Sequence, residues 1–234
     1  MNRSVHKSTV QGQVSVDAGL RAYMQKVFST MGLGLLVTGV TAYFVATTPA
    51  LVNLIFGSSL QWLLLIATLI VPITLGVGIE RLSSGAAQAL FWGYAILMGM
   101  TLSVIFLGYT TDSIARIFLI AACMFGGMSL YGYTTQKDLT AWGSFLFMGL
   151  FGLVLASLVN VFLGSTPLQM ALSVVSVIVF TGLTAYDVQR IRSLYQIAGS
   201  PERQGKFVIL GALSLYLDFI NIFLSLLRLF GDRR

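Results

Sequence analysis

Long stretches without a single charged residue dominate this chain and limit what it can fold into. A helix needs about 20 mostly apolar residues to cross a bilayer. Four charge-free stretches reach that length, at residues 27–79, 82–111, 117–136 and 139–186. Of the 234 residues, 56% are hydrophobic and only 9% are charged, so no part of the chain is left to form a soluble domain. The pattern predicts an all-α integral membrane protein.

Turn-forming residues divide the apolar sequence into seven transmembrane helices of spanning length. The expected helices cover residues 24–46, 60–81, 85–108, 112–134, 140–163, 166–194 and 205–230. Asp112 is expected to cap the fourth helix, and Thr166, Pro167 and Gln169 are expected to form a capping box at the start of the sixth. A seven-helix membrane domain over residues 24–231 then lies between a polar N-terminal tail, residues 1–23, and a charged C-terminal tail, residues 232–234.

The basic residues predict the orientation, because they collect in short loops on the cytoplasmic side of a membrane. With the N-terminus in the cytoplasm, Arg116 is the only basic residue in the three external loops. Arg228, Arg233 and Arg234 then lie outside, against the rule, so the last helix either spans fully or re-enters. The net charge of +6 indicates topology and affinity for anionic lipid headgroups. We expect no nucleic-acid binding, because the basic residues are scattered over several short loops.

The sequence offers little for catalysis or for a bound cofactor. Cys123 is the only cysteine and His6 the only histidine, so Cys–His catalysis and thiolate metal sites are unavailable within one chain. The common nucleotide-binding, zinc-protease and serine-hydrolase motifs do not occur. We therefore expect no enzyme activity.

One carboxylate inside a spanning stretch is the main indication of function. Asp218 lies in the middle of residues 207–227, which carry no other charge. An aspartate at the centre of a membrane helix costs about 2.5 to 3.5 kcal/mol even on lenient insertion scales, so it faces a polar interior or a partner. The helical rise places Asp187, on the antiparallel sixth helix, near the same depth. Two carboxylates in contact cannot both ionise cheaply, so the pair holds a proton or a cation.

Small and polar residues share a helix face with each aspartate, since residues three or four positions apart lie on one face. The face of Asp187 carries Thr184 and Arg190. The face of Asp218 carries four such residues: Gly211, Ser214, Asn221 and Ser225. Ser214, Asn221 and Thr184 are therefore candidates for a polar lining. The plainer alternative is that Asp187 pairs with Arg190 at the interface, and that Asp218 is a protonated structural acid.

Pairs of small residues four positions apart predict where helices approach one another closely. They are Ala95/Gly99, Gly99/Ser103, Ala122/Gly126 and Gly152/Ala156. We interpret these pairs as helix packing rather than as ligand sites.

The residues around the two aspartates also resemble a known family. Residues 213–224 (LSLYLDFINIFL), followed by LRLFG at 227–231 and preceded by GLTAYD at 182–187, are similar to the Bax inhibitor-1 family in its bacterial branch. The QKDL sequence at 136–139 and the helix count support the resemblance. It implies six helices packed around a central seventh, in a bacterial inner membrane. It also implies that Asp187 and Asp218 form the pH sensor of a calcium-permeable leak, and that Arg81 latches the closed state.

The residues and the resemblance together predict a passive, pH-sensitive calcium leak. Calcium takes six to eight oxygen ligands, so Asp187 and Asp218 alone should bind it weakly, as a conducted ion rather than a cofactor. In the closed state we expect Arg81 to donate a charge-assisted bond to Asp187 while the aspartates share a proton. A competing prediction is a membrane-embedded regulator of a membrane protease or secretion complex, which docks through the N-terminal tail. A proton-coupled transporter is a weaker third, because no sequence repeat appears.

Overall fold

The computed structural model describes the backbone of residues 2–234 and the side chains of residues 18–234. Helices make up nearly all of this range, and an isolated β-bridge joins Tyr109 to Arg233. The helices are α1 (Asn2–Ala46), α2 (Pro49–Phe56), α3 (Leu60–Gly78), α4 (Ser84–Leu102), α5 (Val104–Gly108), α6 (Thr111–Thr134), α7 (Thr140–Leu163), α8 (Thr166–Ile197) and α9 (Pro201–Phe230).

Seven segments of the described chain are long and apolar enough to cross a membrane. The first covers residues 18–46 of α1, and α4 and α5 together form the third, over residues 84–108. The prediction of an all-α protein with seven spanning helices is therefore confirmed. Most of the expected N-terminal tail, residues 1–17, lies outside the residues whose side chains the structure describes.

Two helix caps differ from those expected. The N-cap of α6 is Thr110, whose side chain accepts a hydrogen bond from the amide of Ser113, and Asp112 lies in the first turn. The N-cap of α8 is Ser165, which accepts from the amide of Leu168. Both caps have extended backbone, from which a short hydroxyl side chain reaches the third helical amide. The expected capping box at Thr166 is therefore wrong by one residue.

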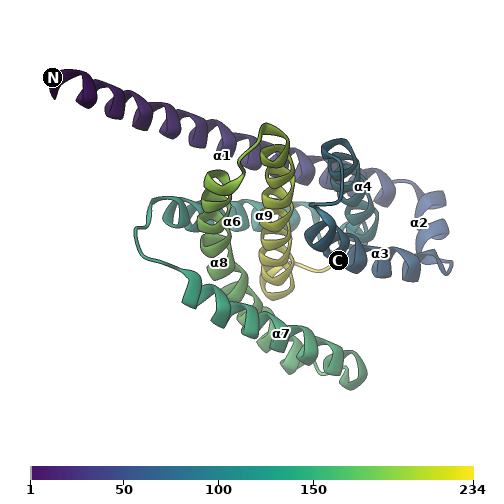
Figure 1. Ribbon diagram of the computed structural model, residues 1–234. Helices are drawn as coiled ribbons and strands as arrows, with labels where there is room; N and C mark the ends of the chain where they lie inside the picture. Colours follow the sequence, from purple (N-terminus) through teal and green to yellow (C-terminus); the bar gives the residue numbers. More distant parts are fainter. Residues whose placement is uncertain (1) are drawn as a thin grey trace.

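Helix α9 is the centre of the bundle. In its most apolar window 72% of the residues are buried, compared with 11% to 33% in the other six spans. It packs against α1, α3, α4, α6 and α8. Helix α7 lies on the outside, where it packs on α8 (Figure 1). The predicted arrangement around a central last helix is confirmed, with α7 one layer further out.

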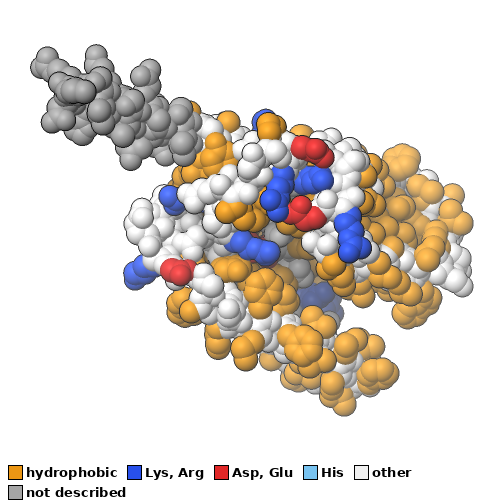
Figure 2. Space-filling view, in the orientation of Figure 1, with side chains coloured by type: hydrophobic (Ala, Val, Ile, Leu, Met, Phe, Trp, Pro, Cys, Tyr) orange, Lys and Arg blue, Asp and Glu red, His pale blue; other side chains and the backbone are white. Residues whose placement is uncertain are grey.

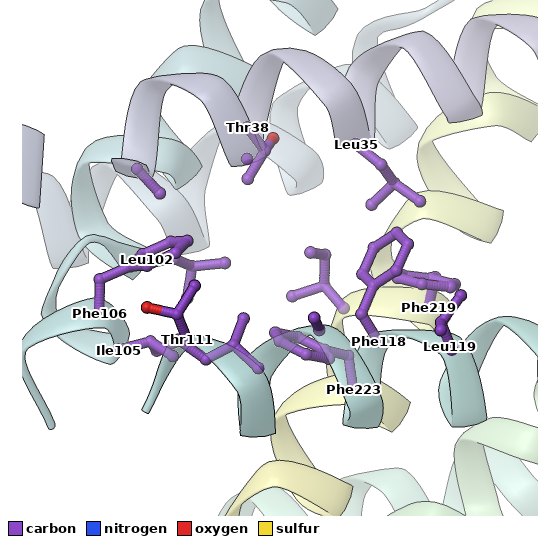
Figure 3. Close-up of a pocket in the computed structure, with 15 residues that line it drawn as sticks. Leu35, Thr38, Leu102, Ile105, Phe106, Thr111, Phe118, Leu119, Phe219 and Phe223 are labelled. Atoms are coloured by element: carbon purple, nitrogen blue, oxygen red, sulfur yellow. The ribbon is translucent and has the colours of Figure 1, made fainter. Parts of the chain in front are cut away.

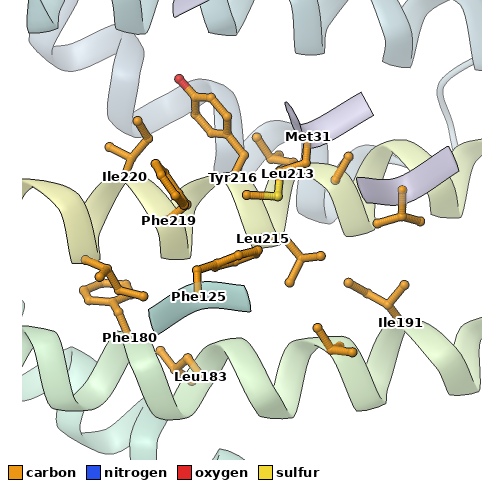
Figure 4. Close-up of a cluster of buried hydrophobic side chains, with 14 of the residues drawn as sticks. Met31, Phe125, Phe180, Leu183, Ile191, Leu213, Leu215, Tyr216, Phe219 and Ile220 are labelled. Carbon is orange, nitrogen blue, oxygen red and sulfur yellow. The ribbon is translucent and has the colours of Figure 1, made fainter. Parts of the chain in front are cut away.

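Aromatic residues fill the core around α9. Tyr216 meets Phe91 and Tyr94 edge-to-face, with ring centres 6.2 Å and 5.8 Å away. Phe219, one turn further along, packs in the same way against Phe125 of α6, at 5.7 Å. Figure 4 shows Tyr216, Phe219 and Phe125 among aliphatic side chains from α8 and α9. Edge-to-face contacts of this kind add to the free energy gained from burial, so they fix the position of α9 against its neighbours.

The outer faces of the peripheral helices are apolar, as expected of surfaces that meet lipid. Val77 of α3 is 84% exposed and Phe162 of α7 is 90% exposed. Figure 2 shows hydrophobic side chains along these flanks, whereas several charged side chains on this face gather near the start of α9. The bundle thus has an apolar girdle and a charged end.

The C-terminal residues lie at the opposite end of the bundle. The amide of Thr110 donates to the carbonyl of Asp232 over 3.0 Å, and Arg116 forms an ion pair with the Asp232 carboxylate at 2.8 Å. These contacts join the end of α9 to the start of α6. Because α9 is one continuous helix of 30 residues, the structure supports a full span rather than a re-entrant segment.

Candidate functional site

Asp187 and Asp218 lie at the interface between α8 and α9, the two helices that pack most extensively. Asp187 is only 7% exposed and Asp218 only 4%. The two carboxyl groups are close enough to interact electrostatically. The structure therefore brings together the two residues that the sequence singled out.

Contacts on both sides of the aspartates fix how α8 and α9 face each other. Towards the start of α9, Gly211 lies against the side chain of Ile191, which a Cβ at that position would press upon. Towards its end, the hydroxyl of Ser225 lies 2.8 Å from that of Ser176. Both residues belong to the small and polar face of Asp218, so this face is directed at α8, as the sequence indicated. Ser176 itself was not singled out in the sequence.

Each of the two buried carboxylates has an oxygen without a hydrogen-bond partner in the described part of the chain. Oδ1 of Asp187 and Oδ2 of Asp218 have no hydrogen-bond partner among the described residues. Two hydroxyls on the helices that pack here, Ser129 of α6 and Thr181 of α8, are in the same condition. A buried polar atom without a partner costs free energy, and a buried charge without one costs more. A proton or a cation bound between the carboxylates would offset this cost, so the arrangement is suited to holding one.

The three candidate lining residues lie beside the aspartates with their own contacts. Thr184 is fully buried and donates to the carbonyl of Phe180 over 2.8 Å. Asn221 is half-buried and donates to the carbonyl of Leu217 over 2.8 Å. Ser214 is also half-buried. Thr184 and Asn221 thus donate hydrogen bonds within their own helices, which satisfies their donors in an apolar setting. A lining role for Thr184, Asn221 and Ser214 stays a prediction.

Arg190 lies one turn beyond Asp187 on α8. It is exposed, and its charge acts on Asp187 through space. No ion pair joins the two within the described part of the chain. The simple surface pairing is therefore not what holds Asp187 in place.

No ion pair joins Arg81 to Asp187 in the part of the chain that this structure describes, so the closed-state latch stays a prediction. Arg81 is exposed just past the end of α3, whereas Asp187 is buried between α8 and α9. The neighbouring residue, Glu80, contacts α9. Its Oε1 accepts a hydrogen bond from Arg203 over 2.8 Å. Lys206 donates to the carbonyl of Glu80 over 3.4 Å. The turn after α3 thus directs Glu80, rather than Arg81, towards α9.

A polar contact that the sequence did not reveal joins three helices in the core. The hydroxyl of Tyr216 lies 2.7 Å from Oγ1 of Thr38. Thr38 also lies 2.9 Å from the carbonyl of Ala95. These bonds connect α9 to α1 and α4. Thr38, a polar residue in an otherwise apolar stretch, could have indicated such a contact. Its partners could not be identified, because they are distant in sequence.

A cavity of about 420 Å³ lies between α1, α5, α6 and α9 (Figure 3). Its walls are almost wholly apolar, and neither aspartate is among the residues that line it. The cavity therefore does not provide the polar surroundings that an ion would need.

No group of three or more His, Cys, Asp or Glu side chains gathers in the part of the chain that the structure describes. A divalent cation at the aspartates would have two carboxylates and would complete its shell with water or carbonyl oxygens.

Comparisons with known proteins place the chain in a family. A family model described as "Inhibitor of apoptosis-promoting Bax1" matches residues 20–234. The inner membrane protein YbhL of Escherichia coli K12 is 48% identical over 224 residues, which cover 94% of this chain and 96% of that protein. An uncharacterized protein of Rickettsia prowazekii is 47% identical over 227 residues, covering 97% of this chain and 96% of its own. One of Caulobacter vibrioides is 40% identical over 234 residues, covering 96% and 94%.

Proposed function

Because the chain belongs to the Bax inhibitor-1 family of membrane proteins, we propose that it is a passive, pH-sensitive calcium leak of a bacterial inner membrane. One observation carries the proposal: the pair of buried aspartates, Asp187 and Asp218, each with an oxygen that has no partner among the described residues. Ionisable residues inside a membrane domain are costly, and they mark ion or proton pathways.

The pair works as a sensor because its charge depends on how many protons it holds. Two carboxylates that share a proton carry one negative charge, and losing that proton doubles it. In a buried setting, a unit charge changes the interaction between facing helices by several kcal/mol. Proton number therefore alters the packing of α8 on α9, and with it the access of ions to the pair.

Calcium is the proposed conducted ion. The two carboxylates supply part of its oxygen shell, and water or carbonyl oxygens supply the rest. Conduction requires binding that is weak enough for the ion to leave. A site with two acidic side chains meets this requirement better than a closed cage of acids.

The orientation belongs to the same proposal. The end of the bundle that carries the α3–α4, α6–α7 and α8–α9 connections is rich in basic residues. We place this end, and the N-terminus, in the cytoplasm by the positive-inside rule.

Reconstitution tests the function directly. Purified protein is inserted into liposomes that contain a calcium-sensitive dye, and the dye signal is followed across a series of pH values. We expect calcium flux above that of protein-free liposomes, with a rate that depends on pH. Flux no greater than in protein-free liposomes at every pH would contradict the proposal, and would favour the regulator of a membrane complex.

A further inference from the structure

Two adjoining cavities lie where α6 and α7 diverge on either side of α8 (Figure 1). One has a volume of about 410 Å³ and the other about 460 Å³. They share Lys137, Asp138 and Tyr186 in their walls. Helices α6 and α7 each pack against α8, so α8 forms the floor of a continuous groove.

The two cavities differ in chemistry. The first is lined largely by apolar residues of the membrane spans, among them Trp142 and Leu146 of α7 and Gly182 of α8. The second is lined by polar residues of the α6–α7 connection and the last turns of α8, among them Lys137 and Arg190. The groove thus has a polar compartment at the end of the bundle and an apolar one towards its middle. A phospholipid has the same order of headgroup and acyl chain.

The polar compartment is held in shape by one side chain. Gln189 of α8 accepts from the amide of Leu139 over 2.9 Å and donates to the carbonyl of Lys137 over 2.8 Å. These two bonds fasten the α6–α7 connection to α8. As a result, Lys137 from the connection and Arg190 from α8 line the same space without any ligand to draw them together.

The charge of this compartment is positive. Neither Lys137 nor Arg190 forms an ion pair with a residue that the structure describes. The one acid in the wall, Asp138, accepts hydrogen bonds from the hydroxyl of Thr140 over 2.6 Å and from its amide over 2.8 Å. These bonds hold the pKa of Asp138 below its usual range. Its carboxylate stays ionised at the start of α7, so the wall carries two positive charges and one negative charge, which leaves it positive overall.

We propose that this groove binds one anionic phospholipid of the surrounding bilayer, with its phosphate between Lys137 and Arg190 and an acyl chain against Leu146 and Gly182. Basic pockets between membrane helices favour acidic headgroups on the cytoplasmic side. The apolar compartment favours a lipid over a free phosphate ion, because only a lipid fills both parts. The lipid proposal does not rest on calcium conduction.

Trp142 provides a direct readout, since it lines the apolar compartment. The chain has three tryptophans, so Trp62→Phe and Trp92→Phe leave Trp142 as the only one. This protein is placed in phosphatidylcholine bilayers that contain a minor fraction of lipid brominated in the upper acyl chain. We expect brominated phosphatidylglycerol to quench Trp142 several-fold more effectively than brominated phosphatidylcholine at the same mole fraction.

Charge variants show whether the two cations are responsible. Lys137→Gln with Arg190→Gln should lower the preference for phosphatidylglycerol by about fivefold for each cation removed. The matched control is Arg21→Gln with Lys26→Gln, which removes the same charge from exposed positions on α1 and should keep the preference. If the first pair does not fold, Lys137→Gln alone gives the same readout with a loss of about fivefold.

Three results would overturn the site. Equal quenching by the two brominated lipids in the parent protein shows no preference for an anionic lipid. An equal loss of preference in both charge variants shows attraction to the membrane surface in general. Removal of the preference by millimolar inorganic phosphate, with potassium chloride at the same ionic strength as the control, shows that a free anion occupies the polar compartment.

Discussion

The hydroxyl of Tyr216 lies 2.7 Å from Oγ1 of Thr38, and this contact fastens α9 to α1 on the side of α9 that faces away from Asp218. Residues two positions apart on a helix point in nearly opposite directions. Helix α9 is therefore fixed on one side by a hydrogen bond, while its other side presents a carboxylate to α8. The bond to Thr38 and the carboxylate of Asp218 thus lie on opposite sides of the same helix.

Tyr216→Phe should lower the free energy of unfolding by about 1 kcal/mol, because it removes one buried hydrogen bond and leaves the ring in place. Tyr94→Phe is the matched control. Its hydroxyl is also buried but has no partner among the described residues, so its removal should leave stability unchanged or slightly higher. Denaturant titration of the two variants in detergent measures the difference. Equal losses would show that the contact with Thr38 contributes nothing.

Asp218→Asn should abolish the pH dependence of calcium flux, because asparagine keeps the shape of the side chain but does not titrate. Asp112→Asn removes an exposed carboxylate from the first turn of α6 and should leave the pH profile as it is. Both variants are compared with the parent in the liposome assay. A profile for Asp218→Asn that matches the parent would rule out this aspartate as the sensor.

Arg81→Ala should leave thermal stability unchanged, since the arginine is exposed and has no ion pair within the described residues. The latch is tested by the basal flux of the same variant. A charge-assisted bond worth about 1.5 to 3 kcal/mol in another state of the protein predicts a rise of at least tenfold at neutral pH. Flux equal to that of the parent would reduce Arg81 to a residue at a helix end.

Gly132→Ala should destabilise the protein by about 1 to 3 kcal/mol, as overpacked substitutions do. A Cβ at this position would overlap the backbone of Ala185 on α8. Gly126→Ala, two turns earlier on α6, meets nothing within 4 Å and should be neutral or mildly stabilising because alanine favours the helix. Thermal unfolding of both variants decides the point. A harmless Gly132→Ala would mean that α6 and α8 separate easily.

Deletion of residues 2–16 separates a leak from a regulator. These residues fall in the range whose side chains the structure does not describe. A leak built on α8 and α9 should keep its calcium flux and pH dependence without them. A regulator that docks through the tail should lose its partner in membranes. Loss of pH-dependent flux from the shortened protein would make the tail part of the gate.

The sequence predicted the parts of the structure that depend on local pattern. Long apolar stretches predicted the spans, and one charge within such a stretch identified Asp218 and its partner Asp187. Of the expected small-residue contacts, Gly99 does lie against α1, but nothing lies within 4 Å of a Cβ at Gly126 or Gly152. Small residues permit a close approach between helices, but the packing of the whole bundle decides which helix lies against each of them.

Contacts between distant and exposed residues were beyond sequence reasoning. Glu80 and Arg203 are 123 positions apart, and many other ion pairs were equally compatible with the sequence. Lys137 and Arg190 meet in one cavity only because Gln189 ties the α6–α7 connection to α8. Pairings of this kind become visible once the helices have been placed.

The short link between α8 and α9 has a consequence for how the protein is made. Only Ala198, Gly199 and Ser200 separate the two helices, and Gly199 adopts a φ of 68°, a backbone conformation that favours glycine. The aspartates therefore sit on a single helical hairpin, and little chain has to be ordered before they meet. During synthesis, the carboxylate of the last helix enters the bilayer beside one that has preceded it. Asp218, the most costly residue to insert, therefore has Asp187 nearby as soon as the last helix enters the bilayer.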